Sequence, residues 1–200
     1  MESTPLDFRA FAFIITLAAV VNGLGIVRWL TALAEYLRQK TSLDMQHYWV
    51  YNLLAAYQFL LHILMWWTLW SVHDAANFNF LTYLYLLTGP VLLFLGTSLL
   101  TPNIQDDGID VRRHFTVVRP MYSTVLTLLW IWALGAGPVL RGFLAPTAPV
   151  LALFLAAAVA LRVTANPKSH AIVAILSWLL AVAYIGLYAM QLGSVVMQPG

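Results

Sequence analysis

The sequence predicts an all-α polytopic membrane protein, a bundle of six transmembrane helices that forms one domain over residues 1–200. Three observations support this fold class. Hydrophobic residues make up 62% of the chain and charged residues only 9%, and the mean hydropathy is +0.81, so a soluble surface could not be assembled from it. The segment from Gln46 to Val72 has no charged residue and is longer than the roughly 20 residues that cross a bilayer. Apolar segments then recur along the whole chain.

The first span is predicted over about residues 8–30, because Pro5 suits a helix start and Arg28 can extend to the far interface. The helical pattern continues over residues 31–42, which form either an overhanging helix end or a short interfacial segment. No basic region precedes the span and no small-residue cleavage site ends it. We therefore expect no cleaved signal peptide.

The second span is predicted over about residues 47–72, with aromatic residues at both ends and Ser42 or Asp44 as its cap. Gln58 and His62 lie near its middle, four residues apart and therefore on one helical face. Lipid offers no hydrogen bonds at that depth. Other helices or trapped water must therefore supply partners for both side chains.

The third span is predicted over about residues 80–100, capped by Asn77 or Asn79. Its centre holds Gly89 and Pro90. A proline inside a helix removes one backbone hydrogen bond and presses on the preceding turn, so we expect a kink there.

The remaining spans are predicted over about residues 120–140, 147–163 and 169–191. The polar segment from Thr101 to Arg119 is expected to be the one part that resembles a soluble loop. Small residues at four-residue spacing let helices approach closely and predict that the fifth helix is packed in the interior. These residues are Ala152, Ala156 and Ala160.

The basic residues predict an orientation in a bacterial-type inner membrane. The side with the loops after the first, third and fifth spans holds Arg28, Arg38, Lys40, Arg112, Arg113, Arg119, Arg162 and Lys168, and the other side holds Arg9 and Arg141. By the positive-inside rule, the first side is cytoplasmic and both termini lie outside.

A weak inverted repeat of three plus three helices is one interpretation of two similar segments. NGLGIVR ends the first span and ALGAGPVLR ends the fourth, each with spaced glycines before an arginine. Such repeats are common in transporters. Chance resemblance between glycine-containing apolar helices is the alternative.

Several function classes are disfavoured by residues that are missing. The absence of cysteine excludes disulfides, thiolate metal sites and thiol nucleophiles. No acid lies in the predicted hydrocarbon core, which counts against ion-coupled carriers and aspartyl intramembrane proteases. We expect no metal site, no cofactor and no nucleic-acid partner, and we lean against an enzyme. The acids all lie in tails, loops or helix ends: Glu2, Asp7, Glu35, Asp44, Asp74, Asp106, Asp107 and Asp110.

The polar side chains at depth are uncharged, and they either line a pathway or pocket or join helices by hydrogen bonds. For His62 alone, three roles are open: a neutral packing residue, a pathway or gating residue, and a cofactor ligand. The full candidate set is Asn22, Gln58, His62, Thr88, Ser177, Tyr184 and Tyr188.

Arg112, Arg113 and Arg119 are interpreted either as lipid headgroup contacts or as a docking site for a partner protein. A cytoplasmic metal-binding or pH-sensing cluster is a further alternative. It would combine His47, His114 and His170 with Asp44, Asp106, Asp107 and Asp110.

Three function hypotheses follow. The first is a channel or facilitator for a neutral or weakly charged small solute. The second is a non-catalytic membrane subunit or scaffold that binds a cytoplasmic or membrane protein through residues 101–119. The third, a redox or lipid-modifying enzyme, would predict a visible absorption band if it held haem or flavin. The lipid bilayer is a partner in each case, and a homo-oligomer is compatible with all three.

Overall fold

The computed structural model describes residues 5–39, 48–70, 79–102 and 110–190, and every regular element in them is a helix. Ser42, Asp44 and Asn77, named above as caps, lie outside these residues. The elements are α1 (Pro5–Gln39), α2 (Trp49–Trp70), α3 (Phe80–Leu100), α4 (Val111–Arg141), α5 (Ala148–Val163), α6 (Pro167–Tyr184) and a π-helical turn, η1 (Ile185–Ala189).

Five of the six α-helices are long and apolar enough to cross a membrane, the exception being α5 with 16 residues. At 1.5 Å per residue α5 is about 24 Å long, somewhat less than a hydrocarbon core of about 30 Å. Large apolar side chains are exposed on the outside of the bundle, among them Val27, Ile131 and Leu179. These features fit a helical integral membrane protein.

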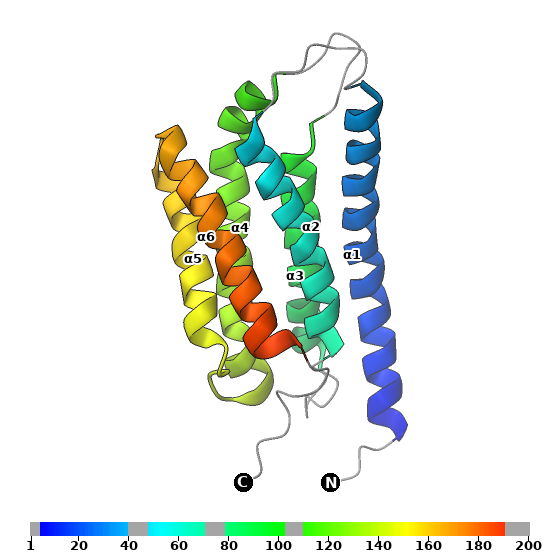
Figure 1. Cartoon of the computed structure of the whole chain (residues 1–200). Helices are drawn as coiled ribbons and strands as arrows, with labels where there is room; N and C mark the ends of the chain where they lie inside the picture. Colours follow the sequence, from blue (N-terminus) through cyan, green and yellow to red (C-terminus); the bar gives the residue numbers. More distant parts are fainter. Residues whose placement is uncertain (1–4, 40–47, 71–78, 103–109, 191–200) are drawn as a thin grey trace.

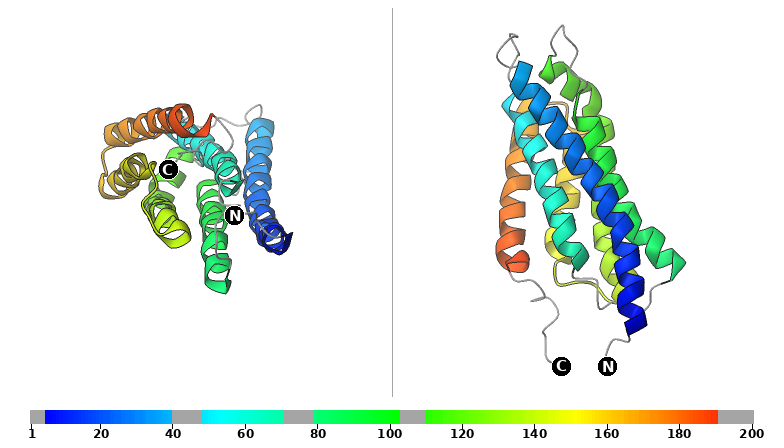
Figure 2. Two further views of the ribbon diagram at one scale, coloured as in Figure 1. Left: turned by 90° about the horizontal axis from the view of Figure 1, so that it is seen from below. Right: turned by 90° about the vertical axis from the view of Figure 1, so that its right-hand side faces the viewer.

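The helices run alternately up and down, with α2 and α3 near the centre (Figure 1). Helix α1 packs on α3 and α2 at one edge, and α4, α5 and α6 form the other part of the bundle (Figure 2). The strongest packing within the first three helices is α1 on α3, whereas in the last three it is α4 on α5. This difference gives the three-plus-three repeat no support.

Helices α2 and α3 occupy nearly the predicted ranges, and α1 continues to Gln39, as the overhanging-helix alternative predicted. The Asn79 side chain caps α3 by accepting a hydrogen bond from the Thr82 backbone N–H at 2.9 Å. Pro90 lies inside α3, which continues through it as one helix.

Helix α4 begins at Val111 and not near Pro120, so the second half of the predicted loop is helical. The Asp110 carboxylate caps this start by accepting from the Arg113 N–H at 2.9 Å. Val111 and Phe115, four residues apart, are both buried. The stretch is polar because its other face is exposed, and burial of the apolar face extends the helix.

The predicted interior face of α5 is wrong. Ala152 and Ala156 are exposed and Ala160 is half-buried. The larger side chains on the opposite face fill the space against α4 and α6 and bury more apolar surface than alanine would. The buried face consists of Leu151, Phe154, Ala158 and Leu161.

Candidate functional site

A buried polar network around His62 is the candidate functional site. The imidazole is 0% exposed, and each of its ring nitrogens has a protein partner. Nδ1 lies 2.7 Å from Oδ1 of Asn22 in α1, and Nε2 lies 2.7 Å from the hydroxyl of Thr97 in α3. The Asn22 amide nitrogen also donates to the His62 carbonyl at 3.1 Å. His62 therefore joins α2 to the helices on both sides.

Gln58, one helical turn before His62, is equally buried and equally satisfied. Its amide nitrogen donates to the Leu93 carbonyl at 3.0 Å and to the Thr97 hydroxyl at 3.2 Å. Its amide oxygen accepts from the hydroxyl of Tyr122 in α4 at 3.1 Å. The network thus connects α4, α2, α3 and α1.

The directions of these hydrogen bonds are mutually consistent if His62 is neutral and protonated at Nδ1. Nδ1–H then donates to Asn22, and Nε2 accepts from the Thr97 hydroxyl, which itself accepts from Gln58. The only buried side-chain polar atom without a partner, among the residues that the structure describes, is Nε of Arg119. Each polar side chain of the network therefore has at least one hydrogen-bond partner within the protein.

Two glycines make room for the network. A Cβ on Gly25 would come within 2.3 Å of Cε1 of His62, and a Cβ on Gly96 would come within 3.1 Å of Nε2 of Gln58. Glycine at these positions lets the backbones of α1 and α3 approach the polar side chains of α2. The spaced glycines of α1 therefore have a packing role at Gly25, whereas a Cβ on Gly23 would meet nothing within 4 Å.

Two tryptophans fasten outer helices to α2 beside the network. The indole N–H of Trp29 in α1 donates to the Ala55 carbonyl at 2.8 Å. The indole N–H of Trp178 in α6 donates to the Leu53 carbonyl at 2.9 Å. Both are side chain–backbone bonds to carbonyls in the first half of α2, and they add to the cohesion of the bundle.

Of the seven predicted polar side chains, Asn22, Gln58 and His62 come together, and the other four do not join them. The Thr88 side chain is exposed and donates to Leu84 of its own helix at 2.8 Å. Ser177 is buried, and it donates to Val173 of its own helix at 2.9 Å.

Tyr184 is the last residue of α6 and Tyr188 lies in η1, and their ring centroids are 5.8 Å apart. Tyr184 lines a cavity in that end of the bundle. The Tyr188 hydroxyl donates to the Pro146 carbonyl in the α4–α5 connection at 3.5 Å. The sixth-helix stripe is thus separate from the network on α2.

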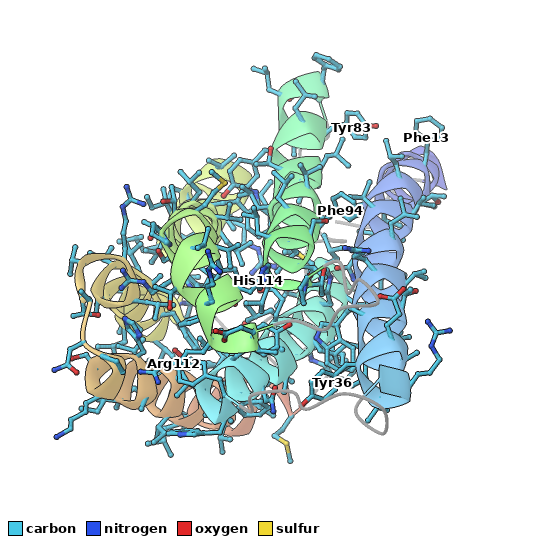
Figure 3. All side chains as sticks on the ribbon, turned by 90° about the horizontal axis from the view of Figure 1, so that it is seen from above. Phe13, Tyr36, Tyr83, Phe94, Arg112 and His114 are labelled. Atoms are coloured by element: carbon cyan, nitrogen blue, oxygen red, sulfur yellow. The ribbon has the colours of Figure 1, made fainter. Side chains whose placement is uncertain are left out.

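The basic residues near the start of α4 divide into two groups. Arg112 and Arg113 are exposed, and Arg112 lies with His114 at the end of the bundle that also carries Tyr36 of α1 (Figure 3). Arg119 is partly buried and contacts two other helices. Its Nη1 donates to the Leu161 carbonyl at 3.1 Å and lies 2.9 Å from Nε2 of His170.

Arg162 of α5 makes the converse contact, donating to the Pro120 carbonyl of α4 at 2.8 Å. The two arginines therefore cross between α4 and α5, each bonded to a carbonyl of the other helix. Charge-assisted bonds of this kind hold the ends of the helices together.

The residues that the structure describes contain no group of three His, Asp or Glu side chains able to hold a metal ion. Nε2 of His114 lies 3.3 Å from the Leu100 carbonyl, and His170 contacts Arg119. His47, Asp44, Asp106 and Asp107 lie outside the described residues.

Sequence reasoning did not identify Thr97, Tyr122, Arg162 or His170 as partners of the predicted residues. The signal for Thr97 was its place beside Gly96 in an apolar helix, because a hydroxyl next to a glycine suits a close helix contact. Tyr122 and Arg162 gave no local signal, since each reaches a residue distant in the sequence.

We compared the chain with known protein families, curated proteins and solved structures. No family model matches the chain, no curated protein matches it, and no solved structure resembles it at the significance required.

Proposed function

We propose that this protein is a non-catalytic subunit or scaffold of a membrane assembly, which binds a partner protein through the basic start of α4. The observation that carries the proposal is that protein groups supply hydrogen-bond partners for the side chains of the His62 network. Every ring nitrogen of His62 and both ends of the Gln58 amide are bonded to protein. Polar groups engaged in this way join helices to one another, which is the role that the scaffold proposal gives them.

Two cavities lined by described residues support the same interpretation. One is lined by residues from α2 to α6 at the end near Arg141, and another lies between α1 and α2 near Tyr36. Neither is lined by Asn22, Gln58 or His62. The solute channel stays a prediction, and liposome flux measurements test it directly.

The docking surface is the exposed face formed by Arg112 and Arg113. Asp110 is the nearest described acid in sequence, and its carboxylate caps α4. Neither arginine forms a salt bridge with a described residue. Two exposed guanidinium groups at a membrane surface fit an acidic segment of a partner protein, since Arg binds carboxylates in a bidentate manner.

The proposal includes six crossings of a bacterial-type inner membrane, with the basic end of the bundle in the cytoplasm. The start of α1 and the end of η1 lie at the same end of the bundle (Figure 1), which an even number of crossings requires. The opposite end carries Arg112, Arg113 and Lys168 in the described residues, and positive charge favours the cytoplasmic side. In this arrangement both termini lie outside.

Affinity purification from the native membrane tests partner binding. We expect a protein to co-purify in stoichiometric amount with the wild-type chain and to be lost when Arg112→Glu and Arg113→Glu are combined. The matched control is Lys168→Glu, an exposed charge at the same end, which should retain the partner. Loss with both variants would indicate a general charge effect, and retention with both would overturn the docking proposal.

Liposome flux tests the channel alternative. Purified protein should pass no small neutral solute above the rate of empty liposomes. Flux that is abolished by Gln58→Leu would overturn the scaffold proposal in favour of the channel. A reporter at the C-terminus that is active only in the cytoplasm would overturn the orientation.

A further inference from the structure

A cavity of about 190 Å³ lies in the half of the bundle that contains the α4–α5 connection. Leu61 and Met65 of α2, Leu86 and Leu93 of α3, and Leu129 of α4 are among its lining residues. Its inner end lies beside the polar network, because Leu93 also supplies a carbonyl to Gln58. Asn22, Gln58, His62 and Thr97 themselves do not line the cavity.

The cavity exists because α4 presents small residues where it faces α2. Ala133, Ala136 and Gly137 line it on the α4 side, and α4 packs mainly on α3 and α5 and hardly at all on α2. The space between the two helices is left unfilled in this half of the bundle. Larger side chains on α4 would close it.

Few of the residues that line the cavity carry a charge or a hydroxyl group. Arg141, the last residue of α4, carries the only charge among the lining residues. Thr68, Thr147 and Tyr184 add hydroxyl groups, and the Thr68 hydroxyl donates to the Met65 carbonyl of its own helix at 3.1 Å. The Tyr184 hydroxyl has no hydrogen-bond partner among the described residues. A mostly apolar pocket with a few polar groups is typical of a ligand site.

We propose that this cavity binds one alkyl chain of an anionic amphiphile, with the chain among the leucines and the carboxylate or phosphate head at Arg141 and Tyr184. An engineered apolar cavity of about 150 Å³ holds one benzene molecule, so 190 Å³ has room for part of one chain and not for two. The proposal concerns a separate site and does not rest on partner binding at Arg112.

The direction of the cavity fits a lipid-like ligand. From Leu129 to Leu140, both in its lining, α4 rises about 16 Å at 1.5 Å per residue. Arg141 ends the helix at the level where a membrane-spanning segment meets the headgroups. The head of the ligand would then sit at the membrane surface and its chain would point to the mid-plane, as in the surrounding lipid.

The experiment uses the full chain in detergent with dibromostearate as the probe, because its bromines quench tryptophan fluorescence and Trp130 and Trp132 line the cavity. We expect saturable quenching, and native mass spectrometry should show one stearate per protein. Ala136→Leu should fill the cavity and abolish saturable quenching. Ala152→Leu is the matched control, because it adds the same side chain to an exposed position of α5, and it should bind as the wild type does.

Arg141→Gln tests the head separately. It should weaken stearate binding about tenfold, the loss of about 1.4 kcal/mol expected for one charge-assisted hydrogen bond, while stearyl alcohol should bind equally to both proteins. Competition by phosphatidylglycerol would identify a diacyl lipid as the source of the chain, and failure to compete would identify a single-chain ligand. Unsaturable quenching, or equal binding by the Ala136→Leu and Ala152→Leu proteins, would overturn the proposal.

Discussion

Asn22 and His62 hold each other through two hydrogen bonds, one from the imidazole Nδ1 to the amide oxygen at 2.7 Å and one from the amide nitrogen to the His62 carbonyl at 3.1 Å. This reciprocal pair joins α1 to α2. It also sets the imidazole tautomer, because an Nδ1–H that donates to Asn22 leaves Nε2 as the acceptor for Thr97.

Replacement of Thr97 by Val should lower the free energy of unfolding by about 1–3 kcal/mol, because it leaves Nε2 of His62 without a donor and one Gln58 N–H without an acceptor. Equilibrium unfolding in mixed micelles measures the loss. The control is Thr88→Val on the same helix, where the hydroxyl is exposed and bonds only its own helix. Equal losses for the two variants would contradict the network.

Gly25→Ala should destabilise the protein by about 1–3 kcal/mol, since its Cβ would lie 2.3 Å from Cε1 of His62 and would displace the ring from Asn22. Gly23→Ala, two residues away, meets nothing within 4 Å and should be neutral or slightly stabilising, because Ala favours the helix. The measurement is the thermal unfolding midpoint of each purified variant. A neutral Gly25→Ala would show that α1 does not approach His62 so closely.

A second close contact joins α3 to α4 at Tyr85 and Trp132. Each side chain donates to the other residue's carbonyl, and the two rings are stacked with centroids 5.6 Å apart. Tyr85→Phe and Trp132→Phe should each cost about 1 kcal/mol, and together less than the sum, because the bonds share one contact. A double-mutant cycle measures the coupling, with Tyr83→Phe as a neutral control. If the two losses of unfolding free energy were strictly additive, the coupling between Tyr85 and Trp132 would be refuted.

Gly89→Ala tests the same contact from the backbone side. A Cβ there would lie 2.4 Å from the ring of Trp132, so the ring must move and the unfolding free energy should fall by about 1–3 kcal/mol. Combination with Trp132→Ala should remove most of the loss, because the clashing ring is then absent. If the loss of unfolding free energy persists in the double variant, a clash with the Trp132 ring is not its cause.

Arg119→Gln should loosen the junction of α4 with α5 and α6, because the Leu161 carbonyl loses a charge-assisted donor and His170 loses its contact with the guanidinium. The expected cost is about 1 kcal/mol, reduced by solvent screening of a partly exposed group. Hydrogen exchange of residues 161–170 should increase. Lys168→Gln, an exposed cation nearby, should change neither quantity, and an equal increase in both variants would contradict the role of Arg119.

Much of the fold could be predicted from local sequence. The ranges of α2 and α3 and the cap at Asn79 follow from apolar length and from capping residues within a few positions. The start of α4 was missed because the average polarity of residues 111–119 hid an apolar face at Val111 and Phe115. The face of α5 was missed because alanine spacing indicates close packing without indicating which neighbour is present.

Three of the five side chains in the polar network were also predictable. Gln58 and His62 were identified because an amide and an imidazole on one face of an apolar helix need partners, and Asn22 because it is an amide in another such helix. Thr97 and Tyr122 were not identified as those partners. Pairing between helices depends on how the helices are rotated and how closely they approach, and neither is encoded within a single segment.

By itself, the sequence determined that this chain folds into long apolar helices carrying buried polar groups, because hydrophobic length and the absence of charge act along one segment at a time. Only the tertiary structure decided what those groups do. It placed Gly25 against His62 and Gly96 against Gln58, so that hydroxyls and amides from four helices meet at hydrogen-bonding distance. It also placed Tyr184 at a separate apolar cavity, since helix packing determines which side chains share a space.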